Sequence, residues 1–350
     1  MDSPKLDVPS VLYAAAVVSV IAILVAAIPV GFYTVFYASL SNVYTYQTVI
    51  PGVPFYIGLL TIRLPFSPTF GATFAVLAAV CAIFIGLAAW QGGGLLRALK
   101  ATPREGVRPL LRNPLSATVI ILGASLFVTQ LLDYLQTTAG IPTGGISGDP
   151  LELLISFNLA AFIEEIGYRF FLIGVPLFVV LLIFRSSVAT SIKALWRPSA
   201  AWDAKPTSAE GRSLQESYKL LVYLLIAFSS LAFGLAHYLA NSGWSVGKIS
   251  EAALDGVALA YLYVRYGLHT SIIYHWATDY ALNAFAFYAQ AVYGVPWTAN
   301  SVYSLVPAYD VLYLVGIPGS MYIAYRIIMW SVARRAPQPL PVPEAQRPMY

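Results

Sequence analysis

Charged residues are scarce in this chain of 350 residues. Asp, Glu, Lys and Arg make up 10% of it, against 59% hydrophobic residues, whereas a soluble globular domain holds about 25% charged residues. The mean hydropathy is correspondingly high, at +0.72. So little charge cannot cover a water-exposed surface, and the composition therefore excludes a soluble globular protein and indicates a polytopic membrane protein.

Cysteine and histidine are also rare. The single cysteine, Cys81, lies in an apolar run, so no internal disulfide can form and no cysteine cluster can hold a metal. The net charge of +4 does not indicate a nucleic-acid partner, because the basic residues gather in a few loops beside apolar runs rather than along a groove. The lipid bilayer is the partner that this composition predicts.

Eight runs approach the length of about 20 apolar residues that crosses the hydrocarbon of a bilayer. They lie near 11–38, 70–92, 115–136, 151–184, 219–240, 249–266, 269–290 and 308–332. The stretch from Val49 to Ser67 is apolar but interrupted by three prolines, and we predict a re-entrant or interfacial segment there. The predicted fold class is all-α, a polytopic transmembrane helical bundle of about eight spans with an active-site core on spans 4 to 7.

The loops between the predicted spans differ in charge. Lys and Arg concentrate in 97–112, 185–219 and 326–347, and the alternate loops are nearly free of them. Because basic loops stay on the cytoplasmic side, an even number of spans predicts that both termini are cytoplasmic. The Pro-rich tail from Ala336 to Tyr350 is predicted to be disordered.

Two adjacent carboxylates and an arginine lie inside span 4. Residues four apart share a helical face, so Glu165 can pair with Arg169 while Glu164 has no partner on its own helix. Ionisable groups at this depth are costly and tend to be functional. We therefore expect Glu164 to take a proton or bind an ion; the alternative is a structural salt bridge that locks span 4 to a neighbour.

Two of the three histidines also lie inside predicted spans. His237 is on span 5, and His275 on span 7 is followed one turn later by Asp279 and two turns later by Asn283. His269, at the short turn between spans 6 and 7, is predicted to be interfacial and is excluded from the site.

Two chemistries are compatible with these residues. In the first, Glu164 and His237 bind and deprotonate a water, and His275 with its helical neighbour stabilises an oxyanion. In the second, His237, His275 and a carboxylate hold a zinc ion, with Glu164 as ligand or base. Any such metal site has to be assembled from three spans, because the sequence has no His-Glu-x-x-His motif.

Three ordered motifs resemble those of a known family. Glu-Glu-x-x-x-Arg at 164–169, Phe-x-x-x-His at 233–237 and His-x-x-x-Asp at 275–279 follow one another on successive spans. This order resembles the CPBP family, which includes the type II CAAX prenyl endopeptidases and bacteriocin-processing or immunity proteins.

The resemblance implies intramembrane proteolysis of a peptide or lipidated protein, such as removal of the C-terminal tripeptide of a prenylated protein. By position, Glu164 and His237 match the residues that activate water, and His275 matches the oxyanion-stabilising histidine. Glu165 and Arg169 match the supporting pair. The resemblance places the catalytic core at 150–290, between N-terminal transmembrane helices at 1–149 and a last transmembrane helix with the tail at 291–350.

Asp279 departs from the family pattern, where asparagine is common. An ionised aspartate would repel an oxyanion, so Asp279 is protonated, binds a metal, or orients His275. We expect the last, with Asn283 as a substitute donor. Two other functions fit the same motifs: a non-catalytic scaffold or bacteriocin-immunity-like protein of this fold, and, less favoured because no repeated halves are seen, an ion- or proton-coupled transporter.

Overall fold

The structure is a computed structural model that describes residues 7–184, 187–201, 209–240, 242–298 and 308–335. The predicted disordered tail lies outside these residues. The α-helices are α1 (Val8–Phe36), α2 (Phe70–Trp90), α3 (Leu95–Glu105), α4 (Arg108–Arg112), α5 (Pro114–Thr138), α6 (Pro150–Glu164), α7 (Val175–Ile183), α8 (Val188–Trp196), α9 (Ala209–Leu239), α10 (Gly247–Tyr266), α11 (Leu268–Trp276), α12 (Leu282–Tyr293) and α14 (Ala308–Arg335). Two π-helices, η1 (Glu165–Gly174) and η3 (Ala277–Ala281), join α6 to α7 and α11 to α12, and η2 (Pro198–Ala201) is a 3-10 turn.

The predicted helical bundle is confirmed. Within the described residues, six helical runs are long and apolar enough to cross a membrane, namely Val8–Phe36, Phe70–Trp90, Pro114–Thr138, Pro150–Ile183, Gly211–Leu239 and Asp310–Met329. Their outer faces carry exposed apolar side chains such as Val76, Ile83 and Leu231. Such faces are suited to contact with lipid tails, and the chain is an integral membrane protein.

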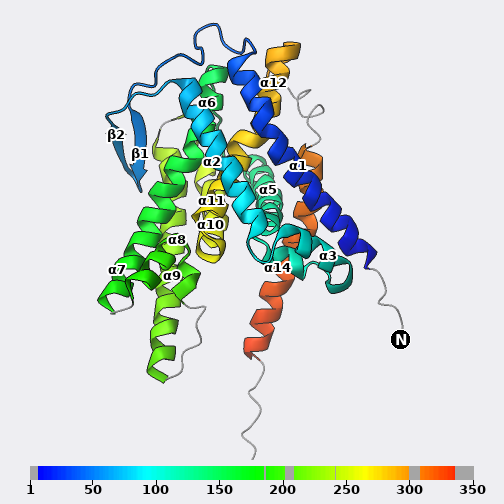
Figure 1. Cartoon of the computed structure of the whole chain (residues 1–350), viewed down its shortest axis with the longest axis vertical. Coiled ribbons are helices and arrows are strands. Elements are labelled where there is room, and N and C mark those ends of the chain that lie inside the picture. Colours follow the sequence, from blue (N-terminus) through cyan, green and yellow to red (C-terminus); the bar gives the residue numbers. More distant parts are fainter. Residues whose placement is uncertain (1–6, 185–186, 202–208, 241, 299–307, 336–350) are drawn as a thin grey trace, which may run out of the picture.

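The other two predicted spans, 249–266 and 269–290, are helical but are not among these six. They correspond to α10 and to the run α11–η3–α12. Both lie in the interior of the bundle (Figure 1), where α10 packs on α9, α5 and α11. Polar side chains such as Glu251 and Asp255 on α10 therefore face protein rather than lipid, which explains why these helices are less apolar than the outer ones.

Successive long helices alternate in direction. In Figure 1, α1 starts at the lower end of the molecule and rises, and α14 descends to that same end. The predicted basic segments, 97–112 on α3 and α4 and the stretch that holds α8, lie at this end too. The start of α1 and the end of α14 therefore lie on one side of the bundle. At this end α7 and α9 extend beyond α10 and α11.

Caps fix where several helices begin. The Asp149 carboxylate accepts hydrogen bonds from the backbone N–H groups of Leu151 and Glu152, and Pro150 occupies the first turn of α6. Asn113 caps α5 in the same way, again with a proline in the first turn. A side-chain acceptor at the N-cap stabilises a helix by about 1 kcal/mol, and proline at N1 costs no hydrogen bond.

The segment predicted to be re-entrant or interfacial forms a β-hairpin. Strands β1 (Val53–Ile57) and β2 (Leu60–Leu64) pair antiparallel, with Phe55 opposite Ile62. The hairpin packs along the middle of the α6–η1–α7 run (Figure 1), where Phe55 makes an edge contact with Phe171 at 5.8 Å between ring centroids. It therefore covers the helical segment that carries the glutamate pair.

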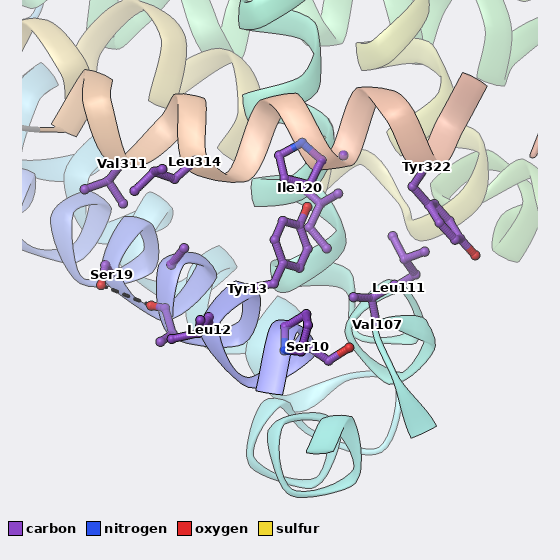
Figure 2. A pocket seen from close by; sticks show the side chains of 15 residues that line it. Ser10, Leu12, Tyr13, Ser19, Val107, Leu111, Ile120, Val311, Leu314 and Tyr322 are labelled. Atoms are coloured by element: carbon purple, nitrogen blue, oxygen red, sulfur yellow. Dashed lines mark hydrogen bonds between the residues drawn. The ribbon is translucent and has the colours of Figure 1, made fainter. Parts of the chain in front are cut away.

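A cleft of about 690 Å³ lies between α1 and α14. Figure 2 shows Tyr13 of α1 pointing across it towards Ile120 and α14, and the Tyr13 hydroxyl donates a 3.0 Å hydrogen bond to the Val315 carbonyl. Its lining is mostly apolar and includes none of the predicted site residues.

Candidate active site

The two glutamates lie where an α-helix becomes a π-helix. Glu164 is the last residue of α6, and Glu165 is the first of η1. A π-helix adds a residue to the turn and is frequent at functional sites. The sequence predicted an unbroken α-helix here, because no residue pattern distinguishes the wider turn. Ser229 of α9 donates a 2.8 Å hydrogen bond to the Tyr168 carbonyl within η1, which helps to satisfy its irregular backbone.

Glu165 and Arg169 form the predicted pair. The Arg169 Nε lies 3.4 Å from the Glu165 Oε2, and both side chains are fully buried. Glu165 also accepts hydrogen bonds from the Ser271 hydroxyl and, at 2.9 Å, from the His275 Nδ1. A buried carboxylate with this many partners is satisfied, so Glu165 serves to hold Arg169, Ser271 and His275 in place.

His275 lies between carboxylates on both sides of its ring. Its Nδ1 faces Glu165, and its Nε2 lies 3.1 Å from Asp279 Oδ2 and 3.8 Å from Glu164 Oε2. Only an imidazolium can donate at both nitrogens, so this arrangement favours the protonated ring. The contact with Asp279 fits the predicted role of that aspartate in orienting His275.

Exposure separates the inner from the outer carboxylates. The Glu165 side chain is 0% exposed, whereas those of Glu164 and Asp279 are 21% and 37% exposed. Glu164 and Asp279 are therefore accessible at the Nε2 side of His275, while the Nδ1 side is sealed. The sequence argument that Glu165 is paired and Glu164 is left open agrees with this geometry.

Phe233 connects the second histidine to this cluster. Its ring lies 4.3 Å from the Arg169 guanidinium carbon, a cation–π distance, and makes edge contacts with His275 at 5.8 Å and His237 at 4.7 Å between centroids. The His237 Nδ1 is 2.9 Å from the Phe233 carbonyl. As the carbonyl can only accept, Nδ1 carries the proton and Nε2 keeps a lone pair.

The structure thus brings together Glu164, Glu165, Arg169, His275 and Asp279. Within the described residues, no hydrogen bond or ion pair joins His237 to Glu164, and His237 meets the cluster through Phe233. Asn283 donates at 2.7 Å to the Asp279 carbonyl of η3, so one of its amide hydrogens already supports the backbone of that π-helix.

Sequence reasoning missed Ser271, whose hydroxyl donates to Glu165 and lies 3.0 Å from the Leu259 carbonyl. One signal could have found it: Ser271 lies four residues before His275 and so shares its helical face. His269, predicted to be interfacial, is fully buried within the protein, with Nε2 at 3.0 Å from Gln91 Oε1 and its ring stacked on Trp196. It takes no part in the cluster.

The side chains in this arrangement do not fit the predicted zinc ion. Among the described residues, no group of three or more His, Cys, Asp or Glu side chains is placed to hold a metal. Both nitrogens of His275 face carboxylates, whereas a ligating imidazole offers a lone pair to the metal.

The hairpin borders the site through Tyr56. A Cβ at Gly167 would collide with the Tyr56 carbonyl oxygen, so the absence of a side chain on η1 lets β1 approach closely. Burial raises the pKa of the Tyr56 hydroxyl, as does the negative charge of Glu164, and Arg63 opposes them. The hydroxyl therefore stays protonated near Glu164 and can act as a hydrogen-bond donor.

Comparison with known proteins gives one family match. A family model described as type II CAAX prenyl endopeptidase Rce1-like matches residues 147–281. Residues 147–281 are therefore similar to this family. The Rce1-like segment, as we call these residues, contains Glu164, His237, His275 and Asp279, and the predicted CPBP resemblance is confirmed. Searches among curated proteins and among solved structures found no match.

The Rce1-like segment covers less than half of the chain. It includes α6, η1, α9, α10 and α11, and η3 ends it. The hairpin and Asn283 lie outside it. The contact of Tyr56 with Gly167 thus joins the hairpin, which lies outside the matched residues, to η1, which lies within them.

Proposed function

We propose that this chain is an intramembrane endopeptidase in which Glu164 activates the attacking water. The observation that carries the proposal is the contrast within the glutamate pair. Glu165 is sealed and fully partnered, while Glu164 is partly exposed with its carboxylate 3.8 Å from the His275 Nε2. A general base has to be accessible and close to the group that stabilises the developing charge.

The residues suggest a complete proton path. Glu164 takes a proton from water, and the hydroxide adds to the scissile carbonyl carbon. Glu165 holds the His275 ring through Nδ1, and the N–H at Nε2, which donates to Asp279 in the structure, turns to donate to the oxyanion as it forms. Collapse breaks the C–N bond, and the proton on Glu164 passes to the leaving amine. His237, with a free Nε2, is the second residue that we assign to the water.

The substrate proposed here is a peptide or a lipidated protein, such as the C-terminal tripeptide of a prenylated protein. The support is the match of residues 147–281 to the type II CAAX prenyl endopeptidase Rce1-like family. A lipid anchor would hold such a substrate at the same bilayer that the six apolar helical runs cross. With the basic loops in the cytoplasm, both termini are cytoplasmic in this proposal.

Substitution of Glu164 tests the proposal. Glu164→Gln removes the base while keeping the shape, so cleavage of a prenylated CAAX peptide by purified protein should fall about 10²–10⁴-fold. Glu152→Gln is the matched control, because Glu152 lies on the same helix but is exposed at its first turn. It should cleave at the wild-type rate. Equal cleavage by all three proteins would contradict the role of Glu164 as the base, and no cleavage by the wild type with any peptide would favour the scaffold interpretation.

Metal removal tests the chemical class. Because His275 is engaged at both nitrogens, we expect cleavage to continue at the wild-type rate after dialysis against a strong zinc chelator. Metal content is measured by mass spectrometry on the same sample. Loss of activity together with loss of stoichiometric zinc, and its return on zinc addition, would contradict the glutamate mechanism.

A further inference from the structure

A basic cleft opens at the end of the bundle where the basic loops gather. It has a volume of about 640 Å³ and is built from segments far apart in the sequence. Its lining comprises Gln91, Gly92, Arg112, Pro114, Ile192, Lys193, Trp196, Arg197, Ala200, Arg265 and Tyr266. Four of these are basic and none is acidic. The cleft between α1 and α14 (Figure 2) is similar in size but has no charged residue in its lining, so charge sets the basic cleft apart.

The frame of this cleft is held by hydrogen bonds. The Tyr266 hydroxyl donates at 2.7 Å to the Leu111 carbonyl, next to Arg112. The Asn113 amide donates at 2.9 Å to the Gln91 carbonyl, and the Gln91 side chain meets buried His269. The Trp196 ring stacks on that same imidazole. Hydrogen bonds thus fix the segments that carry the positive side chains before a ligand binds, which lowers the entropic cost of binding.

Its position relates the cleft to the membrane surface. The apolar run of α2 ends at Trp90 and that of α5 begins at Pro114, so both spans reach the cleft as they leave the hydrocarbon. Trp90, Ile192 and Trp196 are 79%, 56% and 38% exposed. Tryptophan at this depth is typical of the bilayer interface, and the exposed apolar side chains offer a path for an acyl chain beside the charges.

We propose that the basic cleft binds the phosphate headgroup of an anionic phospholipid, with the lipid's acyl chains along Ile192 and Trp196. Basic pockets between membrane helices on the cytoplasmic side suit such headgroups, and each Lys or Arg near an anionic surface contributes about 1 kcal/mol. This site is separate from the glutamate cluster and does not depend on the proposed protease activity.

Lipid retention measured by native mass spectrometry tests the site. Wild-type protein in detergent, offered equal amounts of phosphatidylglycerol and phosphatidylcholine, should retain phosphatidylglycerol preferentially. Arg112→Ala with Lys193→Ala removes two charges and should weaken that retention about 10- to 30-fold. Arg97→Ala with Lys100→Ala is the matched control, because both residues are exposed basic residues of α3 outside the cleft; retention should stay at the wild-type level.

Two further measurements separate lipid binding from misfolding and from the binding of a soluble anion. Arg112→Lys with Lys193→Arg keeps both charges and should keep retention, whatever the alanine variant does to folding. Inorganic phosphate at millimolar concentration should not displace the lipid; full displacement would assign the cleft to a soluble anion and overturn the proposal. Equal retention of the two lipids by the wild type, or equal loss in the cleft and control variants, would overturn it as well.

Discussion

Two neighbouring glutamates have opposite environments in this chain. Glu165 has Arg169, Ser271 and His275 as partners and no exposure, while Glu164 reaches His275 only at 3.8 Å and keeps 21% of its side chain exposed. Removing one partner of a buried ion pair costs about 3–5 kcal/mol of folding stability, so Glu165 and Arg169 are needed for the stability of the fold. Glu164 is not part of this buried ion pair, so its carboxylate is available for chemistry.

At the residue scale, Asp279 provides a sharp test of how His275 is held. An asparagine oxygen can accept the same hydrogen bond from Nε2 that Asp279 accepts at 3.1 Å, so Asp279→Asn should retain activity within about tenfold of wild type. Asp279→Ala removes the acceptor and should lose considerably more. The measurement is the rate of peptide cleavage for both variants, with thermal unfolding as a check on the fold.

The order of these two variants decides the role of the aspartate. If Asp279→Asn were as inactive as Asp279→Ala, the negative charge itself would be required, and orientation of the ring would not explain it. Thr278 is the neighbouring control, because its hydroxyl donates to the His275 carbonyl and does not meet the ring; Thr278→Val should cleave at close to the wild-type rate.

Residue spacing in the sequence predicted many of the contacts in the site, and the contacts that it did not predict have physical causes. The Glu165–Arg169 and His275–Asp279 contacts are local pairs four residues apart, which helical geometry predicts. The contact of His275 with Glu165 joins residues 110 apart, so it depends on how two helices pack. The same holds for Phe233 of α9, whose ring contacts Arg169 of η1 and His275 of α11. It also holds for Asn283, whose amide donates to the backbone of η3.

At the element scale, two π-helices contribute residues to the site. Glu165 and Arg169 lie in η1 and Asp279 lies in η3, each continuous with α-helices on both sides. Side chains support their backbones: Ser229 reaches the Tyr168 carbonyl, and Asn283 the Asp279 carbonyl. Such irregularity costs stability and persists where the surroundings hold it, which is typical of functional segments.

The contact between the hairpin and η1 predicts an effect of Gly167→Ala. Alanine normally stabilises a helix interior by about 1 kcal/mol over glycine. Here its methyl group would collide with the Tyr56 carbonyl oxygen, and overpacking of this kind costs about 1–3 kcal/mol. We expect lower thermal stability in detergent and a several-fold loss of cleavage, as Tyr56 is pushed away from Glu164.

Gly86→Ala is the control for this substitution, because a methyl group there meets nothing within 4 Å on the exposed face of α2. It should leave both stability and cleavage at or above the wild-type values. Equal behaviour of the two variants would show that the hairpin is not seated on η1.

The hairpin is an example of a secondary-structure element that the sequence does not predict. The long apolar runs predict helices well, as with 70–92 for α2, because length and composition suffice. For Val49 to Ser67, the prolines correctly excluded a spanning helix. The turn, however, lacks an Asn-Gly or Asp-Gly signal: Gly58, at a φ of 57°, is followed by Leu59. Pairing of β1 with β2 therefore could not be anticipated.

At the scale of the whole molecule, elements outside the family match enclose the site. The α11 helix, which carries His275, packs on α2 and α5 as well as on α6, α10 and η1. The Tyr280 hydroxyl of η3 donates at 3.3 Å to the Ala27 carbonyl of α1. The helices of residues 1–149 thus pack against α11 and η3 of the Rce1-like segment.

The distribution of charge along the bundle makes a prediction about its orientation. The basic residues of α3, α4 and α8 lie at the end where α1 starts and α14 finishes, and basic loops remain in the cytoplasm. A single cysteine, buried at position 81, makes labelling of introduced cysteines straightforward. In a Cys81→Ala parent, Arg97→Cys marks the basic end, and Thr138→Cys marks the opposite end of α5.

A membrane-impermeant maleimide should label Arg97→Cys in inverted vesicles and Thr138→Cys in right-side-out vesicles, with no label on the parent in either. Both positions are exposed, so lack of access within the protein does not compete with lack of access across the membrane. Labelling of both positions from the same side would contradict the alternation of α1, α2 and α5 through the bilayer. Labelling of each from the other side would keep the fold but place the basic cleft away from the cytoplasm, so the orientation assigned to the termini would be wrong.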